Sequence, residues 1–408
     1  MKIQNFFIAF SLLGFIQLRA QVHFRSTCSN DDTLVIGVRI GDKIFSRDTL
    51  VGKGDHDISM DAGMYAIVKN GNLIGDFILR NSKEPLRVML DCDSIVSFDS
   101  KYNYAFKKFV RTPDNEKIRF FESLEQPSKD ILIWCYPQLA FVSSQTSDYK
   151  TNFQLNDFFK TYLKNSTPFL QNSPFFETNL EYYFSNLISA DRDTLIKYIP
   201  KLEAVLDSGG LAYFRRWALY RFETSKVLGH ENVFIDLASR YMSGSAVIFD
   251  STTDFNVRLK AKNLMPNRIG TVVSDFSVEL VNGLRTNIMS LDGIYKVFYF
   301  FDPDCHHCRE SFPSLKEFAD KYDDYGVRVY AISVGVDKEE LSKFINDFGT
   351  PEKVVFASDN DVSKATFRNL YHIPSTPTIY VVRGNGECLA RGIASSELSR
   401  LFEQIVNN

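Results

Sequence analysis

Short apolar runs separated by turn-forming residues recur in the N-terminal quarter of the chain, which is a pattern typical of β-strands. Such runs occupy residues 33–38, 64–68, 73–79 and 86–90. Asn70-Gly71 lies between two of the runs, and this dipeptide favours the positive φ angles of a tight hairpin turn. We therefore expect residues 21–100 to form a small antiparallel β-sandwich, in which we find no catalytic constellation.

The pattern changes to a helical period between about residues 101 and 262. Apolar residues recur at steps of three and four in residues 175–184 and 213–222, which predicts an all-α region with an aromatic core. Cys135 lies in an apolar segment and is interpreted as an inert buried thiol. His230 has no chemical partner nearby in the sequence and is interpreted as structural.

From residue 263 to residue 408, strand-like and helical patterns alternate. Apolar strand patterns at 297–301, 327–332 and 378–382 are interleaved with helical patterns at 311–322, 338–348 and 396–406. This alternation predicts an α/β layer with a mainly parallel core sheet. The chain is thus expected to be multidomain, with a β domain, a helical domain and a C-terminal α/β domain.

The N-terminus has the features of a secretory signal at residues 1–20. Lys2 precedes an apolar run at residues 6–16, and the small residue Ala20 stands at the expected cleavage site. The run is too short to cross a bilayer, and no later segment is apolar enough to do so. We expect an exported protein of the periplasm or cell envelope, with no integral membrane segment after signal cleavage.

Composition narrows the function classes. The 408 residues are 44% hydrophobic and 24% charged, which excludes a largely disordered or polytopic membrane protein. The formal net charge of -3 gives no basic field for nucleic acid, so no nucleic-acid partner is expected. Six cysteines are too few for a disulfide scaffold. Cys28 and Cys92 could pair in an exported protein, and the sequence leaves that pairing open.

The candidate chemistry lies in Cys305-His306-His307-Cys308, between the strand at 297–301 and the helix that follows. A helix N-terminus favours a thiolate, and the two-residue spacing lets the sulfurs close a disulfide. We assign Cys305 as the nucleophile and Cys308 as the resolving thiol, one turn inward. We expect the imidazole of His307 to favour the thiolate further and to make the disulfide more oxidising.

Four alternatives compete with this interpretation. A zinc site is disfavoured because adjacent histidines on a helix point in different directions, so we expect no metal. An inert structural disulfide and a peroxidase-type thiol are two further interpretations of the motif. In the fourth alternative the chain is an envelope interaction protein, whose β and helical regions bind a ligand or partner while the redox motif is accessory.

Residues 265–408 resemble a thioredoxin-fold domain, and they are most similar to the TlpA/ResA-like thiol–disulfide oxidoreductases. The resemblance is carried by Ser274–Ser277, Phe300–Cys308, Pro313 and His372–Thr378. It implies that Pro377 is cis and acts with Cys305 and Cys308 in catalysis, and that Thr376 and Pro377 align the substrate. It also implies protein thiol or disulfide substrates, no dissociable cofactor and a membrane-bound redox partner. The preceding β and helical regions resemble those of exported Bacteroidetes-type proteins.

Three positions depart from the pattern of the resembled proteins. Asp304 replaces a frequent Trp, Tyr299 stands where thioredoxins proper have a buried carboxylate, and Ser311 replaces a frequent Glu. The proton acceptor for Cys308 and the direction of electron flow therefore stay open. Cys388 is interpreted as an unpaired bystander.

Overall fold

The computed structural model describes residues 20–40, 43–136, 139, 169–170, 172–242, 250–334, 338–349, 351–358, 368 and 370–406. All of the expected signal segment except Ala20 lies outside these residues. The chain divides into two compact units, Met1–Trp217 and Ala218–Asn408, and the division falls within one helix. The domain boundaries at residues 100/101 and 262/263 stay a proposal. Within the described part of the chain, none of the helices has the length and apolarity needed to cross a membrane.

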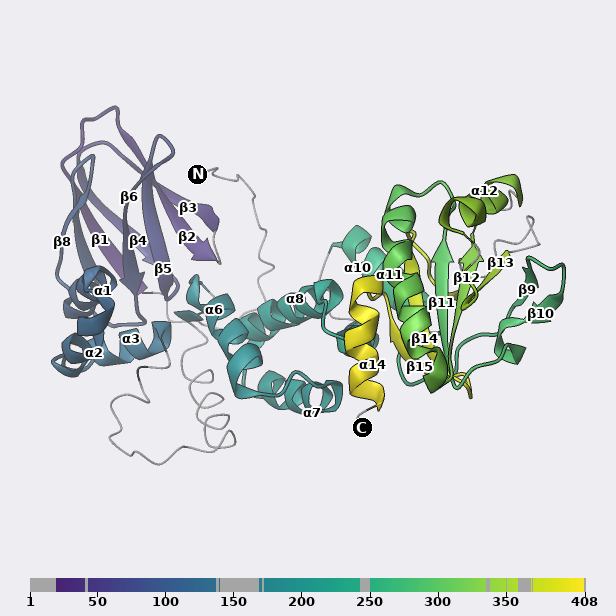
Figure 1. Ribbon diagram of the computed structural model, residues 1–408. Coiled ribbons are helices and arrows are strands. Elements are labelled where there is room, and N and C mark those ends of the chain that lie inside the picture. Colours follow the sequence, from purple (N-terminus) through teal and green to yellow (C-terminus); the bar gives the residue numbers. More distant parts are fainter. Residues whose placement is uncertain are drawn as a thin grey trace. The chain divides into compact units, whose positions relative to one another are not determined.

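The first unit begins with two four-stranded sheets (Figure 1). One sheet has the order β4-β1-β7-β8, made of Gly54–Met60, Ala20–Ser26, Leu86–Leu90 and Ile95–Phe98. The other has the order β3-β2-β5-β6, made of Lys43–Val51, Thr33–Ile40, Gly63–Lys69 and Asn72–Leu79. Side chains from both sheets, among them Phe24 and Phe77, share one buried apolar core. The structure therefore confirms the N-terminal β region.

One strand pair departs from an all-antiparallel sandwich. β1 and β7 run parallel, while the other pairs in these two sheets are antiparallel. A parallel pair needs a long crossover connection, and here the strands β2 to β6 lie between β1 and β7 along the chain. The hairpin prediction is confirmed: Asn70 and Gly71 have φ angles of 50° and 83° between β5 and β6.

Helices follow the sheets in the first unit, and the last of them ends in the second unit. They are α1 Lys101–Arg111, α2 Asp114–Glu122, α3 Ser128–Cys135, α6 Phe175–Tyr182, a π-helical turn Tyr183–Leu187, α7 Arg192–Glu203 and α8 Ser208–Thr224. The buried side chain of Asn103 in α1 exchanges two hydrogen bonds with the backbone of Ile78 in β6, which ties α1 to the sheet. Cys135 is buried, and burial raises the pKa of its thiol, in agreement with the expected inert role.

The second unit contains α9 His230–Met242 and α10 Ser251–Leu264, followed by a seven-stranded sheet. His230 is buried, hydrogen-bonds Ser225 and packs against Phe222, as expected for a structural residue. The strand order is β10-β9-β13-β12-β11-β14-β15. These strands are Arg285–Asn287, Ser277–Leu280, Val354–Ser358, Val327–Ser333, Tyr295–Phe301, Thr378–Arg383 and Cys388–Arg391.

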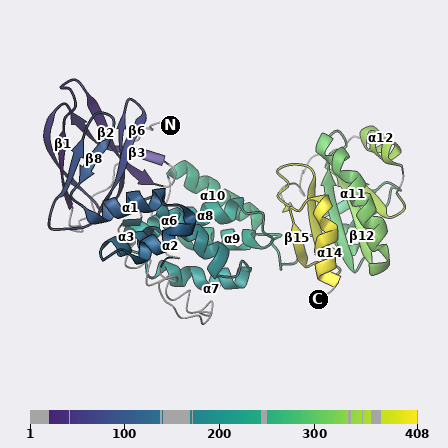
Figure 2. The ribbon, with the colours of Figure 1, turned by 60° about the vertical axis from the view of Figure 1, so that its left-hand side comes forward.

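Helices α11 His306–Tyr322, α12 Lys338–Phe348 and α14 Leu398–Val406 cover one face of this sheet (Figure 2). Side chains alternate along the central strand β11, so Tyr299 and Phe301 pack against these helices while Phe298 and Phe300 enter the core of the opposite face. β11, β12 and β13 pair in parallel at the centre of the sheet, as predicted. The third strand that the sequence predicts, β14, instead runs antiparallel to β11, so the sheet is mixed and not mainly parallel. The carboxyl end of β11 leads directly into α11 and carries the candidate site.

Candidate active site

Cys305 occupies the N-cap position of α11, and its φ and ψ of -69° and 118° are extended rather than helical. Its backbone carbonyl accepts hydrogen bonds from the N–H groups of Cys308 and Arg309, which starts the helix. The Cys305 side chain is partly exposed, and its Sγ lies 3.4 Å from the carbonyl oxygen of Thr376. The predicted nucleophile is therefore at the helix start and within reach of solvent.

The surroundings of Cys305 favour its thiolate. Burial raises the pKa of this thiol, but hydrogen bonds from the Thr376 and Cys308 side chains and from the backbone N–H groups of Cys308 and His307 outweigh that effect. The net result is a pKa below the ordinary value of 9.0. Since two of these donors are backbone groups in the first turn of α11, the helix N-terminus has the effect that the sequence predicts.

Cys308 lies one turn inward and is fully buried. Burial, followed by its hydrogen bond with Cys305, raises the pKa of the Cys308 thiol to about 12. The hydroxyl of Tyr299 donates to the Cys308 carbonyl oxygen at 3.0 Å and lies 2.9 Å from Ser311 Oγ. Burial raises the pKa of Tyr299 well above its ordinary value, so this phenol holds its proton at neutral pH. The two cysteines thus have opposite properties. Cys305 is accessible and its thiol pKa is lowered, whereas Cys308 is buried and its thiol pKa is raised.

Both histidines of the motif point toward Glu310, one turn along the helix. His306 Nε2 lies 3.1 Å and His307 Nδ1 lies 3.3 Å from the two carboxylate oxygens of Glu310. Both imidazoles are about four-fifths exposed. His307 acts on Cys305 through its backbone N–H. The expected effect of the His307 imidazole on the thiolate stays a prediction.

The loop before β14 supplies the opposite wall of the site. The Thr376–Pro377 peptide bond is cis, as the resemblance implies, and both residues are partly exposed. The hydrogen bond from Cys305 Sγ to the Thr376 carbonyl brings together two positions that are 71 residues apart in the sequence. Sequence analysis paired these residues on a resemblance, and their contact is direct in the structure.

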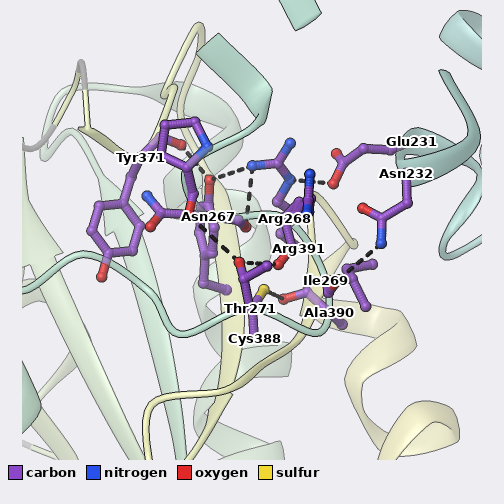
Figure 3. Close-up of polar contacts among 12 residues, drawn as sticks. Glu231, Asn232, Asn267, Arg268, Ile269, Thr271, Tyr371, Cys388, Ala390 and Arg391 are labelled. Carbon is purple, nitrogen blue, oxygen red and sulfur yellow. Dashed lines mark hydrogen bonds and ion pairs between the residues drawn. The ribbon is translucent and has the colours of Figure 1, made fainter. Parts of the chain in front are cut away.

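Polar contacts hold the start of this loop in place, and two of the residues that make them, Asn267 and Tyr371, are labelled in Figure 3. The fully buried Asn267 donates from its side chain to the Leu370 carbonyl, and its Oδ1 accepts from the backbone N–H of Ser274 at 2.7 Å. The Tyr371 hydroxyl donates to the Ser274 carbonyl at 2.6 Å, and the Tyr380 hydroxyl donates to the Tyr371 carbonyl. The segment before the sheet is thereby linked to the loop that ends at Pro377.

Arg391 in β15 continues this network toward α9. Its Nη1 donates to the Asn267 carbonyl at 3.3 Å and to the Tyr380 hydroxyl at 3.4 Å, and its Nε lies 2.6 Å from Glu231 Oε1 (Figure 3). The neighbouring Asn232 donates to the Ile269 carbonyl at 2.8 Å. Nothing in the sequence pattern pairs a residue of α9 with one of the last strand, so sequence analysis missed this network.

Sequence analysis also missed Arg309, which follows Cys308. Its guanidinium pairs with Asp347 of α12, donates to the Pro303 carbonyl at 3.4 Å and lies over the rings of Phe344 and Phe348. The residue thus braces the active-site turn against α12. The only sequence feature that could have pointed to this role is the position of Arg309, a cationic residue directly after Cys308.

Among the described residues, one group has the proximity that metal binding requires: Cys28, Asp32 and Cys92 in the β region. Cys305 and Cys308 belong to no such group among the described residues. Cys388 is fully buried, and burial raises the pKa of its thiol to about 12, which fits its interpretation as a bystander.

Comparison with known proteins identifies the C-terminal part. Residues 293–388 match the model of the thioredoxin-like family. The thiol-disulfide oxidoreductase ResA of Bacillus subtilis is 25% identical over 118 residues, which are 29% of this chain and 63% of that protein. ResA of Geobacillus kaustophilus is 25% identical over 119 residues, 29% of this chain and 66% of the relative. The chain thus spans just under two thirds of the length of these relatives.

Two solved structures are also similar. A domain of a possible thiol-disulfide isomerase from Cytophaga hutchinsonii is 24% identical, with a TM-score of 0.33 over 35% of this chain and 96% of that one. A thioredoxin-like protein from Bacteroides caccae is 17% identical, with a TM-score of 0.42 over 66% of this chain and 94% of that one.

Proposed function

From the premise that residues 293–388 form a thioredoxin-like domain, we propose that this chain is a thiol–disulfide oxidoreductase that exchanges disulfides with protein thiols. The observation that carries the proposal is the pairing of two unlike thiols at one helix start. Cys305 is accessible with a lowered pKa, and Cys308 is buried with a raised one. Such a pair can attack a foreign disulfide and then resolve the product.

In the reductive direction the Cys305 thiolate attacks one sulfur of a substrate disulfide. That S–S bond breaks, a mixed disulfide forms and one substrate thiolate leaves. Cys308 then attacks Cys305 Sγ, which releases the second substrate thiolate, and the proton of Cys308 ends on one of the two released thiolates. The two cysteines have then given two electrons to the substrate and are joined by a disulfide. The reverse sequence of steps oxidises a dithiol substrate.

The Thr376 carbonyl, which precedes Pro377, lies 3.4 Å from Cys305 Sγ, so a substrate strand approaching the sulfur meets the backbone of this loop. An extended peptide can add main-chain hydrogen bonds to such an exposed segment, which suits an unspecialised protein substrate. Export, the periplasm or cell envelope as location and a membrane-bound redox partner belong to the same proposal. The signal-like N-terminus and the similarity to ResA support them.

Reduction of insulin by dithiothreitol, followed by turbidity, tests the proposal on the full chain. We expect Cys305→Ser to abolish the catalysed rate and the matched variant Cys388→Ser, which removes a buried bystander thiol, to keep it. Full activity of Cys305→Ser would refute the mechanism. The reduction potential then gives the direction: about -120 mV favours an oxidant and about -270 mV a reductant.

A further inference from the structure

Two cysteines far from the active site lie side by side in the β region. β1 and β7 pair in parallel, and their last paired residues are Ser26 and Leu90. Cys28 and Cys92 each stand two residues beyond that pair, and the hydrogen bond from Thr27 N–H to the Leu90 carbonyl extends the pairing past the strand ends. Because neighbouring strands are about 4.8 Å apart, this register brings the two Cα atoms into the range that a disulfide spans.

The side chains of Cys28 and Cys92 are in contact with each other and with Asp32. The sulfurs of Cys28 and Cys92 and a carboxylate oxygen of Asp32 all lie within 4.8 Å of one another, and the two thiols are hydrogen-bonded. Cys28 is buried, with 1% of its surface exposed, whereas Cys92 is partly exposed. An oxidant can therefore reach Cys92 first, and Cys28 is in place behind it.

Charges and hydrogen bonds around the pair keep the Cys92 thiol protonated at neutral pH. This carboxylate accepts hydrogen bonds from Cys92 Sγ at 3.0 Å and Ser29 Oγ at 2.6 Å, and it pairs with Lys69 Nζ at 2.8 Å. The Lys69, Ser29 and Cys92 contacts hold the pKa of Asp32 well below its ordinary value, so it is ionised at neutral pH. The hydrogen bonds with Cys28 and Asp32, together with burial, raise the pKa of Cys92 to about 11, so Cys92 attacks through a small thiolate fraction and exchange at neutral pH is slow.

We propose that Cys28 and Cys92 are a second redox pair, which closes a disulfide between the ends of β1 and β7. Cys92 attacks a disulfide of an oxidised thiol compound or protein, whose S–S bond breaks to give one thiol and a mixed disulfide on Cys92. Cys28 displaces the second thiol. In total one S–S bond forms and one breaks, while two electrons and two protons pass from the cysteines to the oxidant.

A metal site is the competing use of the same three side chains, because two thiolates and a carboxylate suit zinc. The geometry favours the disulfide because the ammonium group of Lys69 is already bound to Asp32. A cation at this place would face that ammonium charge, whereas a neutral disulfide would not.

The test uses full-length protein in which Cys305→Ser and Cys308→Ser silence the active site, so its result does not depend on the proposed function. The protein is equilibrated with glutathione disulfide, alkylated and digested. We expect a peptide pair joined through Cys28 and Cys92, with a mass loss of about 2 Da from the two hydrogens removed. We also expect the Tm of unfolding to rise by about 5–10 °C relative to the reduced protein.

Two matched variants in this background complete the test. Cys92→Ser should abolish the rise in Tm, and Cys388→Ser, which alters a buried thiol outside the pair, should keep it. Glutathione attached to Cys92 without a link to Cys28, or two thiols that stay reduced, would overturn the proposal. So would zinc alone raising the Tm and protecting both thiols from alkylation, since that result assigns the cluster to a metal. Mapping of the unaltered pair decides the matter even if Cys92→Ser fails to fold.

Discussion

Glu231 in α9 provides the counter-charge for Arg391 in the last strand of the sheet, with 2.6 Å between Glu231 Oε1 and Arg391 Nε. The Arg391 side chain is only 5% exposed, so its charge has little contact with water. The same guanidinium holds the Asn267 carbonyl, and Asn267 holds the start of the loop that reaches Pro377. The helical segment before the sheet therefore supports the active-site loop within the second unit.

The first prediction concerns this ion pair. Glu231→Gln leaves a buried guanidinium without its carboxylate, and we expect the free energy of unfolding of the second unit to fall by about 2 kcal/mol. The matched variant Glu223→Gln breaks the 3.0 Å pair with Lys260, whose side chain is 38% exposed against 5% for Arg391, and should cost about 0–1 kcal/mol. Urea unfolding measures both, and equal losses would contradict the assigned difference.

The second prediction separates positioning from chemistry. Asn267→Ala leaves the Leu370 carbonyl and the Ser274 N–H without their side-chain partner, at a cost of about 2–4 kcal/mol. We expect KM for a protein disulfide to rise several-fold, while the rate at which iodoacetamide alkylates Cys305 is unchanged. Asn232→Ala, which removes one buried contact to Ile269, is the control and should leave KM unchanged.

If Asn267→Ala does not fold, Asn267→Ser gives a milder test, since it keeps a polar group at this buried position without adding a charge. A variant that slows alkylation of Cys305 and leaves KM alone would show that Asn267 acts on the sulfur and not on the loop.

The third prediction concerns Tyr299, the residue at the place of a buried carboxylate. Tyr299→Phe removes a hydrogen bond to the Cys308 carbonyl, to which Ser311 Oγ still donates at 3.3 Å. We expect unfolding to become easier by about 1 kcal/mol. Because burial raises the pKa of Tyr299 and keeps it neutral, the pH profile of Cys305 alkylation should not move. A shifted profile would mean that the phenol titrates with the site.

The fourth prediction is a pH dependence. The pKa of Cys305 is lowered, so its thiolate forms, and its alkylation rate levels off, at a pH below the ordinary midpoint of 9.0. In Cys308→Ser the single active-site thiol should show this low midpoint. In Cys305→Ser the remaining Cys308, whose pKa is about 12, should be almost inert at pH 8. The reverse order of reactivity would exchange the two assigned roles.

Much of the fold could be predicted from the sequence because it is locally encoded. Strands β5, β6, β7, β11, β12 and β14 follow apolar patterns that need no distant partner to be recognised. Strands β3, β4 and β10 were missed because they expose much of their surface, and β15 because it has only four residues. Their pairing is decided by contacts with strands distant in the sequence.

The site divides in the same way. The helix-start placement of Cys305 and the buried position of Cys308 follow from a strand, a short turn and a helix, which are all visible in the local sequence. The residues of the Glu231–Arg391 pair are 160 positions apart in the sequence (391 − 231 = 160), and no periodic pattern of residues predicts their contact. The Cys28–Cys92 pair was left open because only the register of β1 with β7 brings these sulfurs together.

Trapping of mixed disulfides by the full-length protein tests the central assignment most directly. Reduced Cys308→Ser, in which Cys305 lacks its resolving partner, is mixed with a disulfide-bonded protein such as insulin and analysed by non-reducing electrophoresis and mass spectrometry. We predict a stable covalent complex joined through Cys305, and none with the double variant Cys305→Ser/Cys308→Ser. The absence of a Cys305-linked complex, or an equal yield from the double variant, would contradict the account.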